Sequence, residues 1–255
     1  MTRIITSLSD ISESYNAVFC DLWGCVHDGL APFAEAATAL QAFRAKGGTV
    51  MLVTNAPRPH APVRRQLDRL GVPSDAYDGI ATSGDSARAA MLRGAVGEKV
   101  YFIGQPHDQD FFTPLELIET PVTISQVPLE QAEGIVCCGP FDPLADPEEM
   151  RAQFLQAKAR GLKLLCANPD IVVDRGETRE WCAGALAKLY TQMGGESLYF
   201  GKPHPPIYDL ARRRLEALGK DIPDSRILCV GAGILTDIDG ALGEDLDSLF
   251  ITGGL

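Results

Sequence analysis

The chain has 255 residues, of which 45% are hydrophobic and 22% are charged, and its formal net charge is −11. This length suits one large globular domain or two smaller ones. The negative charge argues against nucleic acid or an anionic membrane as the main partner, and no apolar stretch is long enough to predict a membrane span.

The cysteines indicate a reducing compartment. There are seven, an odd number, and five of them lie within apolar runs. Their spacing matches no metal site, and no signal peptide precedes them. We therefore expect a cytoplasmic protein with free thiols in its core.

Short apolar runs alternate with helical patterns along the chain. Residues 32–46, for example, carry apolar side chains at i, i+3 and i+4 spacing before a Gly-Gly pair, which predicts a helix and its end. The predicted strands are 17–20, 49–54, 100–104, 134–138, 163–167, 198–201, 227–230 and 248–252, and the predicted helices are 32–46, 60–70, 85–93, 147–160 and 205–218. This alternation is typical of a parallel α/β architecture.

Side chains with useful chemistry follow four of the predicted strands. They are Asp21, Thr54 with Asn55, Lys202 and Asp237. In open parallel sheets, ligands bind beyond the carboxyl ends of the strands. A hydroxyl, loop amides and an ammonium suit a phosphate, and two carboxylates beside a phosphate imply Mg²⁺ between them. Taken singly, each residue is as readily a turn former, a solvated lysine or a helix cap.

Together these segments resemble the haloacid dehalogenase superfamily of phosphotransferases over nearly the whole chain. The matching motifs are "DLWGCVHDG" from Asp21, "TVMLVTNAP" with Thr54, "FGKPHPPIYDLA" with Lys202, and "GAGILTDIDGA" with Asp237. The likeness is strongest to subclass IIA, which holds nitrophenylphosphatase-like and sugar- or nucleotide-phosphatase-like members. It implies a Rossmann-like parallel-sheet core of residues 1–83 and 196–255, and an inserted α/β cap domain of residues 84–195.

The resemblance also implies catalytic roles. Asp21 would attack phosphorus and form an aspartyl-phosphate. Thr54 would bind the phosphoryl oxygens, Asn55 would shape the loop, and Lys202 would bridge the phosphate and Asp21. Asn168, in the family-like segment "ANPD", is a candidate substrate contact and equally a candidate turn former.

The implied cofactor is Mg²⁺. Its ligands would be Asp21, the backbone carbonyl of Trp23, and Asp237. The fourth motif, however, usually carries a further acid, a direct metal ligand, where this chain has Ala232. We therefore expect weak Mg²⁺ binding, and the sequence leaves open whether this alanine is natural.

A second departure lies in the first motif. The family usually has an acid two residues after the nucleophile, which protonates the leaving oxygen, whereas this chain has Trp23. General acid–base help is worth roughly 10²–10⁴ in rate. The sequence leaves the replacement open between His27, Asp28, a carboxyl from the cap, and the substrate itself.

The sequence thus predicts a Mg²⁺-dependent phosphatase that acts on a small phosphorylated metabolite, such as a sugar phosphate or nucleotide. The alternatives are a weak or inactive relative that binds a phosphorylated ligand, and a structural α/β partner protein. Nicotinamide binding is disfavoured because Thr236 stands at the third glycine of the dinucleotide pattern. Homo-oligomer formation and the identity of the substrate stay open.

Overall fold

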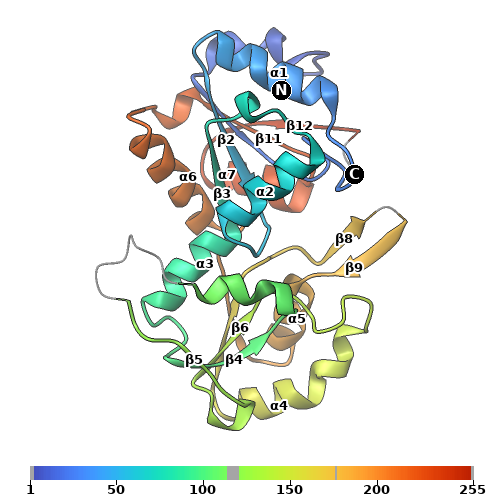
Figure 1. Ribbon diagram of the computed structural model, residues 1–255, viewed down its shortest axis with the longest axis vertical. Coiled ribbons are helices and arrows are strands. Elements are labelled where there is room, and N and C mark those ends of the chain that lie inside the picture. The colour runs from blue at the N-terminus through green and yellow to red at the C-terminus, as the bar shows by residue number, and fades with distance from the viewer. Residues whose placement is uncertain (1–2, 114–120, 176, 254–255) are drawn as a thin grey trace. The chain divides into compact units, whose positions relative to one another are not determined.

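The computed structural model describes residues 3–113, 121–175 and 177–253. The chain forms two compact units (Figure 1). The first unit comprises Met1–Thr54, Ala61–Ala81 and Lys202–Leu255. The second unit comprises Asn55–His60 and Thr82–Gly201.

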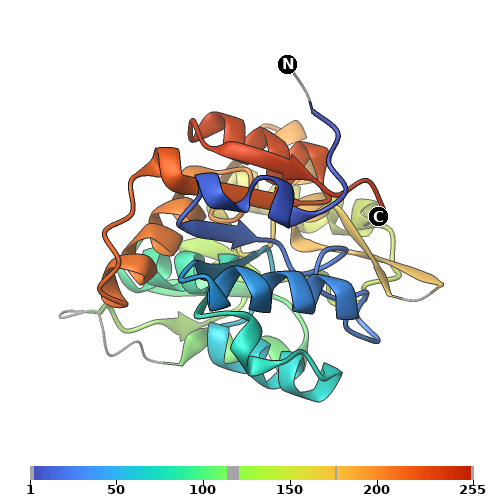
Figure 2. The same cartoon turned by 90° about the horizontal axis from the view of Figure 1, so that it is seen from above.

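A five-stranded sheet forms the centre of the first unit. Its strand order is β12 (Asp247–Phe250), β11 (Ile227–Gly231), β1 (Ala17–Cys20), β2 (Thr49–Thr54) and β3 (Gly79–Thr82). β1 pairs in parallel with both β11 and β2, so segments from the two ends of the sequence lie side by side (Figure 2). The helices of this unit are α1 (Ala34–Ala45), α2 (His60–Leu70), α6 (Pro205–Ala217) and α7 (Asp239–Gly243), with a π-helical turn η8 (Ile234–Ile238) before α7.

All residues of β1 and β2 are buried, as expected for strands that are covered on both faces. Alternate residues such as Ala17 and Phe19 pack with Ile207, Ala211 and Leu215 of α6 in one hydrophobic cluster. This period of two follows from the pleat of the strand. Packing on both faces therefore fixes β1 rigidly at the middle of the sheet.

The second unit has its own five-stranded sheet. Its order is β10 (Glu196–Tyr199), β7 (Lys163–Cys166), β6 (Gly134–Cys137), β4 (Lys99–Ile103) and β5 (Ser125–Gln126), and the neighbouring strands are parallel. Its helices are α3 (Ser83–Leu92), α4 (Arg151–Ala159) and α5 (Ala183–Gln192). An antiparallel hairpin joins β8 (Val172–Arg175) to β9 (Thr178–Trp181).

The parallel α/β architecture predicted from the sequence is confirmed, with strand bounds within two residues of those expected. The boundary between the units differs from the expected residue 195, because β10 pairs with β7 and extends the second unit to Gly201. The sequence patterns did not single out β3, β5, β8, β9, α5 or α7. The hairpin escapes detection because its residues are exposed or half-buried and the apolar run at 171–173 is only three residues long.

Short 3₁₀ turns connect many of these elements. They are η1 (Leu8–Asp10), η2 (Ser12–Ser14), η3 (Ser74–Ala76), η4 (Pro106–Phe112), η5 (Leu129–Gln131), η6 (Pro147–Met150) and η7 (Asp224–Arg226). Among the described residues, no helix combines the length and apolar character needed to cross a membrane. The seven cysteines are free and buried.

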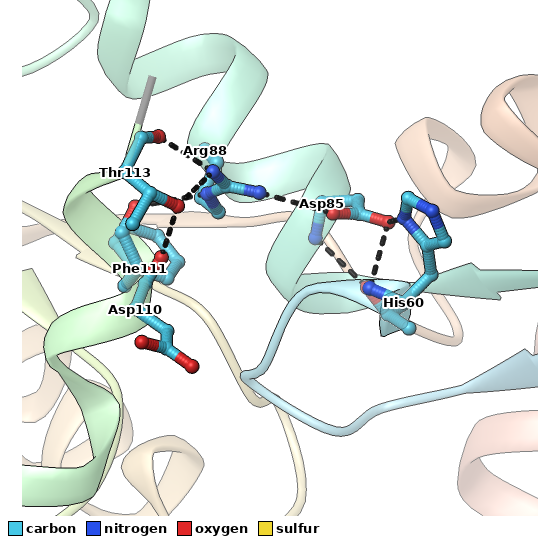
Figure 3. Close-up of polar contacts among 7 residues, drawn as sticks. His60, Asp85, Arg88, Asp110, Phe111 and Thr113 are labelled. Atoms are coloured by element: carbon cyan, nitrogen blue, oxygen red, sulfur yellow. Dashed lines mark hydrogen bonds and ion pairs between the residues drawn. The ribbon is translucent and has the colours of Figure 1, made fainter. Parts of the chain in front are cut away.

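A buried ion pair anchors α3 inside the second unit (Figure 3). Asp85 and Arg88 are 5% and 3% exposed, and their Oδ1 and Nη1 atoms lie 3.3 Å apart. The other oxygen of Asp85 accepts the backbone N–H of His60 and lies 2.8 Å from the His60 Nδ1 atom. Arg88 donates to the carbonyls of Phe111 and Thr113. The pair therefore ties the segments around residues 60 and 112 to one helix.

We expect the substitution Asp85→Ala to lower the free energy of unfolding by about 3–5 kcal/mol, because it leaves the Arg88 guanidinium buried without its carboxylate. Urea denaturation of the intact chain measures this change. The matched control is Asp174→Ala, which removes an ion pair with Arg179 on the exposed hairpin and should leave the denaturation midpoint unchanged. Equal midpoints for the two variants would contradict the structural role of Asp85.

Candidate active site

The carboxyl ends of three neighbouring strands meet in the first unit. Cys20, the last residue of β1, is in register with Leu52 of β2 and with Val230 of β11. Asp21 follows directly, and its N–H donates to the Val230 carbonyl at 2.8 Å. Thr54 ends β2 and is 7% exposed. The sheet register therefore places the carboxylate and the hydroxyl at the same edge.

Lys202 joins two carboxylates at this edge. Its Nζ atom lies 2.6 Å from Asp21 Oδ1 and 2.6 Å from Asp237 Oδ1, and all three side chains are largely buried. Burial by itself lowers the pKa of Lys202, but the two carboxylates outweigh it and raise the pKa well above the usual lysine value. The three side chains therefore combine one ammonium with two carboxylates and carry a net negative charge.

The loop after β11 positions Asp237. The second carboxylate oxygen, Oδ2, accepts the N–H of Gly233 at 2.9 Å. A Cβ atom on Gly231 would lie 2.1 Å from the Asp237 Cγ atom, so residue 231 must be glycine for this approach. Ala232 lies between these glycines and is 8% exposed, and its methyl group supplies no ligand.

The loop after Asp21 is packed around Trp23. A Cβ atom on Gly29 would lie 2.3 Å from the Trp23 Cη2 atom, and Gly29 has a φ of +88°, which favours glycine. The ring of His27 lies edge-on to the indole, with centroids 5.3 Å apart. His27 is 2% exposed. Trp23 is therefore part of a preformed loop.

Asp28 ends this loop as a turn former. Its Oδ1 atom accepts the N–H groups of Leu30 and Ala31, each at 2.8 Å. These two hydrogen bonds lower the pKa of the exposed Asp28 carboxyl. A carboxylate that is held ionised in this way is poorly suited to donate a proton.

The remaining predicted residues lie in the second unit. Asn55 Nδ2 donates to Asp170 Oδ1 at 2.8 Å, and the N–H of Asp170 donates to Asn168 Oδ1 at 3.0 Å. Asn168 thus forms a side-chain turn. The structure groups Asn55 and Asn168 around Asp170, which the sequence reasoning did not assign. Asp170 could have been found from the sequence, because it is the last residue of the family-like segment "ANPD" that contains Asn168.

Comparisons with known proteins identify the family of this chain. The family described as haloacid dehalogenase-like hydrolase matches residues 18–117. A solved haloacid dehalogenase-like hydrolase from Brucella suis is 43% identical, with a TM-score of 0.92, over 99% of this chain and 90% of its own. This chain belongs to the haloacid dehalogenase-like hydrolases. No curated protein matches it significantly.

Two solved structures with lower sequence identity share the fold of this hydrolase. A possible sugar phosphatase from Cytophaga hutchinsonii is 19% identical, with a TM-score of 0.79 over 100% of this chain and 90% of its own. A glycerol phosphate phosphatase from Mycobacterium tuberculosis, solved with calcium, is 23% identical, with a TM-score of 0.70 over 96% of this chain and 68% of its own.

The candidate metal ligands of the hydrolase are of the chemical type that a hard divalent cation prefers. Asp21, Asp237 and the Trp23 carbonyl are all oxygen donors, and Mg²⁺ commonly uses one or two carboxylates with water and substrate phosphate. They are few in number, since Ala232 adds none and Lys202 already contacts one oxygen of each carboxylate. Within the described ranges, no three His, Cys, Asp or Glu side chains form a metal-holding group.

Proposed function

We propose that the chain is a cytoplasmic, Mg²⁺-dependent phosphatase that acts on a small phosphorylated metabolite, such as a sugar phosphate or nucleotide, through Asp21. The observation that carries this proposal is the Lys202 ammonium held between Asp21 and Asp237. A phosphoryl group that approaches Asp21 brings more negative charge, and phosphoryl transfer depends mainly on positioning and on charge neutralisation.

The proposed reaction divides the work among three side chains. A carboxylate oxygen of Asp21 attacks phosphorus and forms an aspartyl-phosphate, which water then hydrolyses. Lys202 orients Asp21 and neutralises the phosphoryl oxygens. The Thr54 hydroxyl, at the neighbouring strand end, donates a hydrogen bond to the same oxygens. Asp21 directly follows the packed strand β1, and the buried Lys202, in the turn before α6, already contacts it, so little reorganisation is required.

Asp21, Asp237 and the Trp23 carbonyl are the residues that would hold Mg²⁺. The ion, when bound, supplies further positive charge to the phosphoryl oxygens. Crystals of the Mycobacterium tuberculosis relative contain calcium or magnesium, which supports the choice of a divalent cation.

The assignment of the nucleophile is tested with Asp21→Asn, which keeps the shape of the side chain and removes the attacking charge. We expect phosphatase activity to fall by at least about 10³-fold, since removal of a nucleophile disables the covalent route, and a hydroxylamine-sensitive acyl phosphate to disappear. The matched control is Asp28→Asn, which retains an acceptor for the Leu30 and Ala31 N–H groups. A few-fold effect of Asp21→Asn would refute the assignment.

The shortage of metal ligands is tested with Ala232→Asp. We expect tighter Mg²⁺ binding by calorimetry and at least about tenfold higher turnover, the order of one strong electrostatic contact in a dry site. Trp23→Asp should help less, because the indole packs against Gly29 and His27. If Trp23→Asp improves both quantities and Ala232→Asp improves neither, the deficiency lies in the first loop.

We further propose that the second unit is the cap domain and that Asn55 and Asn168 contact the substrate from its Asp170 cluster. Its separate sheet and core support this proposal. Lids of this kind select substrates by closing over a site.

Replacing Ser83–Gly201 by a short Gly-Ser linker should leave a cooperatively folding first unit, because its sheet and core are complete without them. We expect this shortened chain to bind phosphate and to lose discrimination among phosphomonoesters. Circular dichroism melting and a substrate panel measure the two effects. An unfolded product would contradict the independence of the first unit.

The second candidate function is a catalytically silent protein that binds a phosphorylated ligand. Ala232 and Trp23, each at a position where the family usually has an acid, favour it. Phosphate or vanadate binding without turnover, before and after Ala232→Asp, would support this alternative.

A further inference from the structure

Two segments that carry charged groups of the candidate site pack against each other. Lys202 lies in the turn before α6, and Asp237 lies in η8, which continues directly into α7. The two backbones meet at the buried Gly240 of α7, where an added Cβ atom would lie 3.0 Å from the Cα atom of Pro203. Because Pro203 directly follows Lys202 in the chain, this contact influences where the lysine lies.

The side chain of Tyr208 fills the remaining space at this contact. Tyr208 lies near the start of α6 and is 2% exposed. Its hydroxyl oxygen would lie 2.2 Å, and its Cζ atom 3.0 Å, from a Cβ atom added to Gly240. Any larger residue at position 240 would therefore push against the end of the tyrosine side chain and against Pro203. The close approach of the two segments requires glycine at this point.

Gly240 is also linked to Asp237 through the helical backbone. It follows Asp237 by three residues, so the two positions are about one helical turn apart and lie on a similar side of the helical segment. The Asp237 side chain is held from another direction by Gly231, where a Cβ atom would lie 2.1 Å from the Asp237 Cγ atom. Close packing therefore fixes both the carboxylate and the helical turn that carries it.

A second contact joins the same two helices further along. The Arg212 Nη1 atom of α6 lies 2.6 Å from the Oε2 atom of Glu244, the residue that follows α7. Arg212 is four residues after Tyr208, and Glu244 is four residues after Gly240. Two contacts about one turn apart therefore hold α6 on α7, and only the first adjoins the segments that carry the lysine and the aspartate. This arrangement allows positioning of the site to be separated from general support of the fold.

We propose that Tyr208 and Gly240 are positioning residues, which set the place of the Lys202 ammonium relative to the Asp237 carboxylate. This inference rests on the proposed phosphatase function. Phosphoryl transfer depends mainly on positioning and on charge neutralisation, so the ammonium must lie at a defined place. Protein interiors are close-packed and transmit strain, so a displacement at the contact of Gly240 with Pro203 is passed on to the charged side chains beside it.

The experiment exchanges atoms between the two partners of this contact and measures kcat and KM for nitrophenyl phosphate in Mg²⁺. Gly240→Ala places a methyl group against the tyrosine oxygen. We expect it to lower kcat by at least about tenfold, with a smaller change in KM, since a displacement of about 1 Å can cost about 10²-fold. Tyr208→Phe removes the oxygen and only opens a gap, so it should lower kcat by a smaller factor of about two to five.

The double variant is the decisive one. Without the tyrosine oxygen, the new methyl group meets only the ring Cζ atom and the Pro203 Cα atom, each at 3.0 Å, and these contacts are relieved by shifts of a few tenths of an ångström. We therefore expect kcat of the double variant to return to within about threefold of the unaltered chain. Such a departure from additivity is expected of residues in direct contact.

Two matched controls separate positioning from support of the fold. Gly243→Ala lies on the same helix, at a position where an added Cβ atom meets nothing within 4 Å, and should leave kcat unchanged. Glu244→Gln weakens the second contact between the helices. It should lower the urea midpoint of the intact chain and leave kcat of the folded protein unchanged, because this contact does not adjoin the segments that carry the charged groups.

The outcomes distinguish this inference from the proposed function. An unchanged kcat in Gly240→Ala, a double variant no better than the product of the single effects, or an equal loss of kcat in Glu244→Gln overturns the inference and leaves the phosphatase standing. If Gly240→Ala alone does not fold, a folded double variant with near-normal kcat supports the inference, and a double variant that also fails to fold overturns it.

If the unaltered chain hydrolyses no phosphomonoester, the proposed function falls. Calorimetric titration of the same variants with inorganic phosphate then decides the positioning. We expect the affinity to fall in Gly240→Ala and to return in the double variant, and equal affinities in all the variants would overturn the inference.

Discussion

The Lys202 ammonium, buried between two carboxylates, is the contact on which the proposed chemistry depends. Its Nζ atom lies 2.6 Å from Asp21 and 2.6 Å from Asp237. Two buried carboxylates would repel each other strongly without it, because charges interact more strongly away from water. The lysine ammonium stabilises the two carboxylates at this short distance. The three groups together still carry a net negative charge, so a phosphate can bind beside them only if further positive charge is supplied.

This constraint relates the two unusual positions of the chain. A family member with an acid at position 23 and another at 232 would hold more negative charge at the site and would need a firmly bound cation. In this chain the side chains of Trp23 and Ala232 are uncharged, so the site carries less negative charge and needs a bound cation less. Under the proposed function, the same two residues leave the Mg²⁺ site with one carboxylate fewer and position 23 without an acid.

The sheet of the first unit supplies the precision. β1 lies between β11 and β2 in a parallel register, and it is covered on both faces. Glycine at 231 lets the backbone approach the Asp237 side chain closely, so that the carboxylate meets both Lys202 and a backbone N–H. The second unit is built on the same α/β principles, yet its cluster of Asn55, Asn168 and Asp170 consists of uncharged amides and one acid. This composition supports the proposal that the cluster contacts the substrate.

The sequence by itself determined the architecture and the main chemical groups. Apolar runs such as Ala17–Cys20 are short, continuous and followed by turn residues, so they mark buried strands and point to Asp21 at a strand end. The family likeness named Thr54, Lys202 and Asp237 because their motifs are local. Only the tertiary structure showed that one ammonium contacts both carboxylates, since residues 21, 202 and 237 are far apart in the chain and no local pattern encodes a distance.

Tertiary packing also decided matters that the local sequence left open. It buried His27, whose Nδ1 atom accepts the Gly29 N–H, and it made Asp28 a turn former. It placed Glu196–Tyr199 in the second sheet, because strand pairing depends on which partner lies alongside and not on the apolar run alone. The hairpin β8–β9 emerged only in three dimensions, since its half-buried residues carry no periodic signal. Local patterns encode burial and turns, whereas charge pairing and strand partners are properties of the folded chain.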